Sequence, residues 1–321
     1  MDPTRGAFKL FRLAGVEVWL HWMWLPFAFL MVALRPDAYA SPAWKAVEYV
    51  ALAASVLAHE FGHVLACRSV GGTARTIVLW PLGGIALVSP PARPGALLWS
   101  IAGGPLANLV LAVPFALLAL LVPADTWKDL HVLLATLALM NVLLCAFNLL
   151  PAYPLDGGQM LHALLWFRLG RWKGLQAASA VGVALGAMIL FGAVALVPLL
   201  ARQGLPFELP LVLAVVAAFM ALQSAATFQA VRQVLMIEAL PRRTDCACPS
   251  CHSAPFAGPL WVCDECRTRF DVYETRGKCP ACGAWYLQQA CLGCRATAHI
   301  DRWFEYLPGK GLERPEEERE A

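Results

Sequence analysis

Charged residues are scarce in this sequence. They make up 15% of its 321 residues, whereas a soluble globular domain carries about 25%. Hydrophobic residues reach 59% and are gathered into long blocks, without the period of a half-buried helix or strand. The scarcity of charge excludes an ordinary soluble enzyme, and the blocks indicate a polytopic membrane protein.

Six apolar blocks are long enough to cross a bilayer, since a spanning helix needs about 20 residues. We expect spans at residues 18–34, 47–67, 96–122, 131–150, 175–200 and 209–230. Ten Lys and Arg residues lie in the connectors on one side and four on the other. The positive-inside rule then places both termini in the cytoplasm.

The first apolar block has a second interpretation. Residues 38–40, Ala-Tyr-Ala, could be the cleavage site of a secretory signal peptide. The block is long for a signal, however, and its Trp22 and Trp24 are typical of the aromatic belt at a membrane surface. We therefore expect a retained span.

Residues 73–88 lie between the second and third blocks and contain β-branched residues on both sides of Pro81-Leu82-Gly83-Gly84. This pattern predicts a short β-hairpin at the cytoplasmic edge of the membrane. A plain connecting loop is the alternative.

The second block contains His59, Glu60 and His63. On a helix, histidines four residues apart project from one face, one turn apart. Two neutral imidazoles can bind zinc, and an adjacent glutamate can accept a proton from the attacking water. Ionisable groups at the bilayer centre cost about 2.5–3.5 kcal/mol and usually serve a function. The alternative is a buried His–Glu pairing that holds helices together.

A catalytic zinc usually has three protein ligands, so a third is needed. Asp156 lies on the cytoplasmic side of the fourth block, after Pro151 and Pro154, which break the helix. A turn with a solvated aspartate is the alternative interpretation. Other acids border the later blocks on the far side of the membrane: Asp125, Asp129 and Glu208. On chemical grounds three further histidines could bind metal: His21, His131 and His162.

Three ordered motifs carry a family resemblance. They are His-Glu-x-x-His from His59, Gly-Gly-Pro-x-x-Asn ending at Asn108, and Asn-x-x-Pro from Asn148 followed by Leu-Asp-Gly around Asp156. Over residues 10–235 the sequence resembles the site-2 proteases, intramembrane zinc metalloproteases, in their small six-span bacterial branch.

The resemblance implies an integral protein of the bacterial inner membrane that cleaves transmembrane protein substrates within the lipid bilayer. It implies a zinc ion held by His59, His63 and Asp156, with Glu60 as general base. It also implies that Asn108 and Asn148 support the substrate or the oxyanion.

A transmembrane substrate must be unwound locally before its peptide bond can be attacked. An exposed edge of the predicted hairpin could hold the unwound segment by strand addition, an arrangement also known in the family. A proline at Ile77 should break such an edge.

The C-terminal region holds nine of the eleven cysteines. Eight form Cys-x-x-Cys pairs: Cys248 and Cys251, Cys263 and Cys266, Cys279 and Cys282, Cys291 and Cys294. Pairing them in sequential order would give two structural zinc sites of four thiolates each, as in a double zinc ribbon. Disulfides are the alternative, but they seldom persist in the reducing cytoplasm. His252 and His299 could replace a thiolate as ligand.

This region has no excess of basic residues. From Arg242 onward there are eleven Lys and Arg and twelve Asp and Glu. Binding to nucleic acid favours a basic surface, so we expect a protein partner for the zinc ribbon instead.

The sequence therefore predicts a polytopic α-helical membrane protein with about six transmembrane helices, a β-hairpin and a small zinc-ribbon domain. The expected domains are a membrane metalloprotease at 1–240, a double zinc ribbon at 241–307 and a disordered tail at 308–321. The rival function is an inactive membrane anchor that displays the ribbon. A zincin with a downstream glutamate ligand is disfavoured, because no Glu lies inside the later blocks.

Overall fold

The computed structural model describes residues 4, 6–26, 39–80, 83–203 and 208–307. The chain divides into two compact units, Met1–Gln233 and Val234–Ala321. The first contains most of the long helices, and the second contains the clustered cysteines. The tail expected at 308–321 lies outside the described residues.

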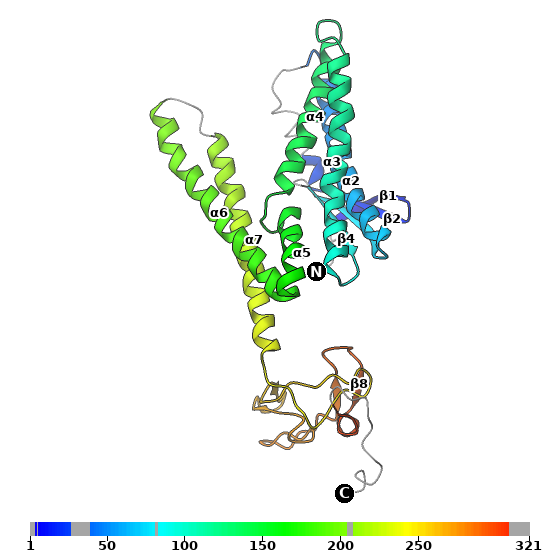
Figure 1. Cartoon of the computed structure of the whole chain (residues 1–321), viewed down its shortest axis with the longest axis vertical. Coiled ribbons are helices and arrows are strands. Elements are labelled where there is room, and N and C mark those ends of the chain that lie inside the picture. Colours follow the sequence, from blue (N-terminus) through cyan, green and yellow to red (C-terminus); the bar gives the residue numbers. More distant parts are fainter. Residues whose placement is uncertain (1–3, 5, 27–38, 81–82, 204–207, 308–321) are drawn as a thin grey trace. The chain divides into compact units, whose positions relative to one another are not determined.

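Six helices follow one another along the chain (Figure 1): α2 (Pro42–Ser69), α3 (Pro94–Leu121), α4 (Lys128–Asn148), α5 (Asp156–Leu169), α6 (Arg171–Arg202) and α7 (Glu208–Glu238). Among the described residues, five helices are long and apolar enough to cross a membrane: α2, α3, α4, α6 and α7. They coincide with five of the six predicted blocks. The remaining helix, α5, has 14 residues and was not predicted.

The prediction of a span at 18–34 is wrong in its first part. Residues 18–21 belong to β2 (Val16–His21), an inner strand of a four-stranded sheet. The strand is apolar because its side chains at Val16 and Val18 are fully buried, and not because it faces lipid. The part of the predicted span at 27–34 lies outside the described residues.

The sheet has the order β1-β2-β3-β4, with β1 (Ala7–Leu13), β3 (Thr73–Trp80) and β4 (Gly83–Ser89) as its other strands. The β3–β4 pair is antiparallel and confirms the predicted hairpin. The β1–β2 pair was not predicted. Ala14 and Gly15 connect its strands with positive φ angles of 49° and 75°, as a type I′ turn requires. The β2 and β3 strands run parallel.

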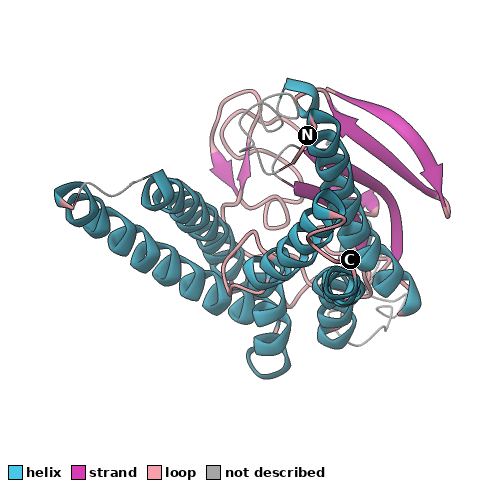
Figure 2. Cartoon of the chain, turned by 90° about the horizontal axis from the view of Figure 1, so that it is seen from above, coloured by secondary structure: helices cyan, strands magenta, loops and turns pink. Residues whose placement is uncertain are grey.

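One face of this sheet packs against α2. Val16, Val18 and Ile77 from the sheet form a buried cluster with Val64 of α2. Each fully buried side chain of this size stabilises the fold by about 1.5–3 kcal/mol. Figure 2 shows the long strands as curved arrows beside the helices of this unit. The sheet is thereby held against the helix that contains His59 and His63.

The helices α2 and α3 approach each other closely through glycine. A Cβ atom added to Gly62 would lie 2.2 Å from the Gly103 carbonyl oxygen, and one added to Gly103 would lie 2.2 Å from that of Gly62. Small residues allow helix backbones to meet in this way in membranes. The contact brings Asn108, farther along α3, within reach of His59.

The cysteine-rich unit contains two small hairpins and a short helix: β5 (Trp261–Val262) with β6 (Arg269–Phe270), β7 (Gln288–Ala290) with β8 (Thr297–His299), and α8 (Ile300–Trp303). Its core joins buried cysteines to Val272, Tyr273, Ile300 and Trp303. So little apolar area gives limited stability to a domain of this size.

Candidate metal centre

Three predicted side chains converge within the first unit. His59 and His63 project from α2, and their Nε2 atoms lie 3.2 Å apart. The Oδ2 atom of Asp156 lies 3.1 Å from His59 Nε2 and 3.4 Å from His63 Nε2. All three residues are buried. A tetrahedral zinc with ligand bonds of about 2.0–2.2 Å separates its ligand atoms by about 3.3–3.5 Å, so these separations suit zinc.

Asp156 reaches this position because the chain turns sharply after α4. Pro151 and Pro154 lie in that turn, and α5 begins at Asp156 itself. A Cβ atom on Gly157 would lie 2.3 Å from the Leu149 carbonyl oxygen, and one on Gly158 would lie 2.6 Å from backbone carbon of the turn. The two glycines therefore allow the turn to fold back tightly on the end of α4. The helix N-terminus also favours a carboxylate there.

The hydrogen bonds of the two imidazoles fix the tautomer of each ring in its neutral form. His63 Nδ1 lies 3.1 Å from the backbone carbonyl oxygen of Ser100. A carbonyl only accepts, so Nδ1 donates and the Nε2 lone pair of the neutral ring is bare. His59 Nδ1 likewise donates to Asn108 Oδ1. Within the described residues, Asp156 Oδ2 has no hydrogen-bond donor other than these two imidazoles.

In these neutral tautomers, two nitrogen lone pairs and a carboxylate oxygen thus face one another in a buried space. They would repel each other in the absence of a cation. Gly104 keeps this space open, because a Cβ atom there would lie 2.4 Å from His63 Nε2. Two imidazoles and one carboxylate form a typical ligand set of catalytic zinc. The donor set therefore fits zinc.

Glu60 lies beside this cluster, against strand β4. Its Oε2 atom accepts a 2.8 Å hydrogen bond from the backbone N–H of Ala86. A Cβ atom on Gly84 would lie 2.4 Å from Glu60 Cγ, so only glycine leaves room for this side chain. Glu60 is 5% exposed and contributes no atom to the three-residue cluster. Its carboxylate remains available for proton transfer.

The same hydrogen bond identifies the free edge of the sheet. Because Ala86 donates to Glu60, its N–H points away from β3, and β4 is the edge strand of the sheet as described. Ile77 instead lies in the inner strand β3, fully buried between β2 and β4. The prediction that a proline at Ile77 tests the edge is therefore wrong, because it would disrupt the core of the sheet.

The two predicted asparagines differ in their surroundings. Asn108 is fully buried and hydrogen-bonded to His59. Asn148 donates to the Leu144 carbonyl of its own helix, and no hydrogen bond in the described part of the chain joins it to the cluster. Sequence reasoning missed Asn141, which accepts a 3.0 Å hydrogen bond from Asn108. An amide inside an apolar block was the available signal, since burying it unpaired is costly.

The alternative histidine ligands have other partners. His131 bonds to the Val122 carbonyl oxygen, His162 bonds to that of Arg171, and His21 stacks on Trp80. Within the described residues, none of these three joins a group that could hold a metal ion.

The cysteines form two groups of four, but not in sequential order. Cys263 and Cys266 join Cys279 and Cys282, whereas Cys248 and Cys251 join the last pair. That last pair is Cys291 and Cys294. The predicted sequential pairing is therefore wrong, and the sites are nested. The buried core around Tyr273 and Trp303 brings the start and the end of the unit together.

The sulfur geometry of both groups suits zinc. Neighbouring Sγ atoms lie 3.4 Å apart for Cys263 and Cys282 and 3.7 Å apart for Cys248 and Cys294. A tetrahedral zinc with bonds of about 2.3 Å separates its sulfurs by about 3.8 Å. All eleven cysteines are free thiols in the structure. His252 and His299, the substitute ligands considered from sequence, belong to neither group.

Neighbouring hydroxyl groups favour the thiolate form of one buried cysteine in each site. The Tyr286 hydroxyl donates to Cys263 Sγ and lowers the pKa of that thiol to about 6. Burial raises the pKa of Cys291, but hydrogen bonds from Ser253 and backbone N–H groups outweigh it and lower the value to about 6. Thiolates at neutral pH are the form that binds metal.

The first unit is similar to known zinc metalloproteases. The model of the family described as Peptidase family M50 matches residues 47–129 and 124–192. The zinc metalloprotease MJ0392 of Methanocaldococcus jannaschii is 32% identical over 191 residues, which cover 58% of this chain and 54% of that protein. The chain thus spans about half the length of this curated relative.

A solved structure resembles the fold as well. The site-2 protease from Methanocaldococcus jannaschii has a TM-score of 0.50 and 25% sequence identity, covering 69% of this chain and 95% of that one. The family match includes His59, Glu60, His63 and Asp156, and it ends before the cysteine-rich unit begins.

Proposed function

We propose that the membrane-spanning part of this chain is a member of the site-2 protease family of zinc metallopeptidases (peptidase family M50), and that the chain is an intramembrane endopeptidase. It hydrolyses peptide bonds in or near the transmembrane segments of other proteins. The observation that carries this proposal is the convergence of His59 Nε2, His63 Nε2 and Asp156 Oδ2 at distances of 3.1–3.4 Å. The intact donor set argues against an inactive membrane anchor.

Each residue of the site has one role in this proposal. His59, His63 and Asp156 hold the zinc ion. When bound, zinc polarises the scissile carbonyl and lowers the pKa of its water ligand. Glu60 accepts the proton of the attacking water and transfers it to the leaving amine. All four residues are at most 8% exposed, which limits their contact with bulk water.

The edge of β4 suits an unwound substrate segment. Its Ala86 N–H already donates to the Glu60 carboxylate, so a substrate strand added at this edge would lie next to the proposed general base. Asn108 supports His59 through its hydrogen bond. Asn148 has no comparable contact, and we assign it no role in oxyanion binding.

Two structural zinc ions in the nested cysteine sites complete the proposed metal content of three. We propose domain boundaries at 1–240 and 241–307, since α7 ends at Glu238 and the first cysteine of the two groups is Cys248. The charge distribution of the connectors supports cytoplasmic placement of both termini, and the family resemblance supports an inner-membrane protein. The balanced charge of the cysteine-rich unit supports a protein partner over nucleic acid.

Metal analysis together with a cleavage assay tests the proposal. The purified chain should contain about three zinc ions, and His59→Ala should lose one of them. The variant Glu60→Gln should keep its zinc but cleave a membrane-spanning substrate about 10²–10⁴-fold more slowly. Two zinc ions in both the wild type and His59→Ala would refute the assignment, as would normal cleavage by Glu60→Gln.

A further inference from the structure

A chain of buried polar side chains extends from His59 away from the metal site. Asn108 Nδ2 donates to Asn141 Oδ1 at 3.0 Å. Asn141 Nδ2 then donates to Ser55 Oγ at 3.1 Å and to the Leu137 carbonyl oxygen at 2.8 Å. Asn108, Asn141 and Ser55 are at most 5% exposed. Three helices, α2, α3 and α4, contribute to this chain.

The direction of these hydrogen bonds is fixed at one end by the backbone. The Leu137 carbonyl can only accept, so Asn141 must direct its NH₂ group toward it and its oxygen toward Asn108. Asn108 must then direct its NH₂ group toward Asn141 and its oxygen toward His59. An acceptor at that position requires a proton on His59 Nδ1.

We propose that Asn141 is a positioning residue that selects the tautomer of His59 through the amide of Asn108. With the Asn108 oxygen facing Nδ1, the His59 Nε2 lone pair is free for zinc. A flipped Asn108 would present NH₂ to Nδ1, and the neutral ring would carry its proton on Nε2 and lose the metal. This inference rests on the proposed zinc site.

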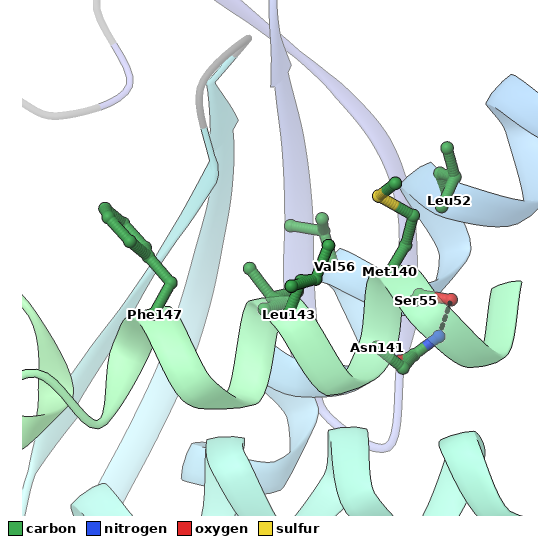
Figure 3. Close-up of a pocket in the computed structure, with 8 residues that line it drawn as sticks. Leu52, Ser55, Val56, Met140, Asn141, Leu143 and Phe147 are labelled. Carbon is green, nitrogen blue, oxygen red and sulfur yellow. Dashed lines mark hydrogen bonds between the residues drawn. The ribbon is translucent and has the colours of Figure 1, made fainter. Parts of the chain in front are cut away.

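The surroundings of Asn141 support this role over contact with a substrate. Figure 3 shows Asn141 hydrogen-bonded to Ser55 beside a pocket of about 330 Å³ between α2 and α4. The other residues around the pocket are apolar: Leu52, Val56, Met140, Leu143, Leu144 and Phe147. Leucine would be less costly to bury at position 141 than an amide. The polar atoms of Asn141 are used within the protein.

The second histidine does not need such a chain. His63 Nδ1 lies against the Ser100 carbonyl, which cannot reverse its polarity. The amide of Asn108 can reverse, because its oxygen and nitrogen are nearly the same size. Asn141 should therefore act on His59 alone.

Chelator competition on the purified full chain measures the zinc affinity of the membrane site, and the cysteine sites serve as internal controls. Asn141→Leu should weaken zinc binding by about 10- to 100-fold, as loss of an outer hydrogen-bond partner does at other metal sites. Ser55→Ala should have a smaller effect, because the Leu137 carbonyl still orients Asn141. Ser179→Ala is the matched control: it removes a fully buried hydroxyl bonded only within its own helix and should leave the affinity unchanged.

A rescue experiment separates tautomer selection from packing. Aspartate at position 108 presents an oxygen to His59 in either orientation. In the Asn108→Asp background, Asn141→Leu and Ser55→Ala should therefore no longer change zinc affinity. An equal loss in both backgrounds would overturn the proposal, as would full affinity in Asn141→Leu itself.

The remaining outcomes also decide the matter. If Asn141→Leu is not recovered in folded form, Ser55→Ala in the two backgrounds makes the same comparison. If the wild-type chain binds zinc and cleaves substrate, but the Asn141 and Ser55 variants have unchanged zinc affinity, this inference alone is overturned. A wild-type chain without zinc in the membrane site would overturn both this inference and the proposed function.

Discussion

Gly104 illustrates how much of the site depends on a missing side chain. Its Cα position leaves no room for a methyl group, since a Cβ atom would lie 2.4 Å from His63 Nε2 and 2.7 Å from His59 Nε2. The glycine therefore keeps free the space where the two lone pairs meet. The sequence motif includes Gly104, but the motif alone does not reveal why a glycine is needed at this position.

We expect Gly104→Ala to weaken zinc binding at the membrane site. Overpacking of a closed site costs about 1–3 kcal/mol, which corresponds to about 5- to 150-fold in affinity. Competition with a chelator measures the change. Gly95→Ala is the matched control on the same helix, because its Cβ atom would meet only Phe167, at 3.9 Å. Equal affinities of the two variants would contradict this account of Gly104.

Much of the candidate site could be predicted from local sequence. The four-residue spacing of His59 and His63 fixes their common face on any helix, and the prolines before Asp156 indicate a broken helix. Asn141 could not be assigned in this way. Its contact with Asn108 depends on how α3 packs against α4, and hydropathy alone does not contain that information.

At the scale of the element, strand β2 shows why the first predicted span was partly wrong. Val16 and Val18 alternate with Glu17 and Trp19, but the strand continues into an apolar run that resembles a span. The strand pairs in parallel with β3, from a distant part of the chain. Only the tertiary structure reveals that its apolar face covers α2. The β3–β4 hairpin was predictable because its two strands are adjacent in sequence.

Strand β4 offers a test of substrate binding by strand addition. Alternation from Ala86 directs the N–H of Val88 away from β3 as well. Val88→Pro should therefore remove an edge donor and spare the ladder. We expect it to slow cleavage of a substrate with a stable transmembrane helix more than cleavage of one loosened by glycine and proline.

The ratio of the two cleavage rates is the measurement, with zinc content as a check that the site is intact. Val88→Ala loses a similar amount of packing but keeps its N–H, and should leave the ratio unchanged. An equal slowing of both substrates by Val88→Pro would count against strand addition.

At the scale of the whole molecule, the chain combines two units that are stabilised by different forces. The first buries apolar side chains between long helices and a sheet. The second has a small core in which five of the eleven buried residues are cysteines. Four equivalent Cys-x-x-Cys pairs give no reason to prefer one pairing from sequence alone. The nested arrangement depends on the aromatic core that lies between the ends of the unit.

The nesting makes stability of the second unit depend on metal. The site of Cys248, Cys251, Cys291 and Cys294 joins the two ends of the unit, and zinc binding supplies folding free energy in domains of this size. Zinc removal by a chelator should therefore unfold this unit, while the helices of the first unit, which contribute no cysteine to either group of four, remain folded. We expect trypsin to cut at Arg267, Arg276 and Lys278 after chelation and much more slowly before it.

The variant Cys291→Ser should reproduce this trypsin sensitivity without chelator. The control variant Cys145→Ser changes a cysteine outside both sites and should not. Persistent resistance of the chelated protein to trypsin would show that the aromatic core alone is sufficient to hold the unit together.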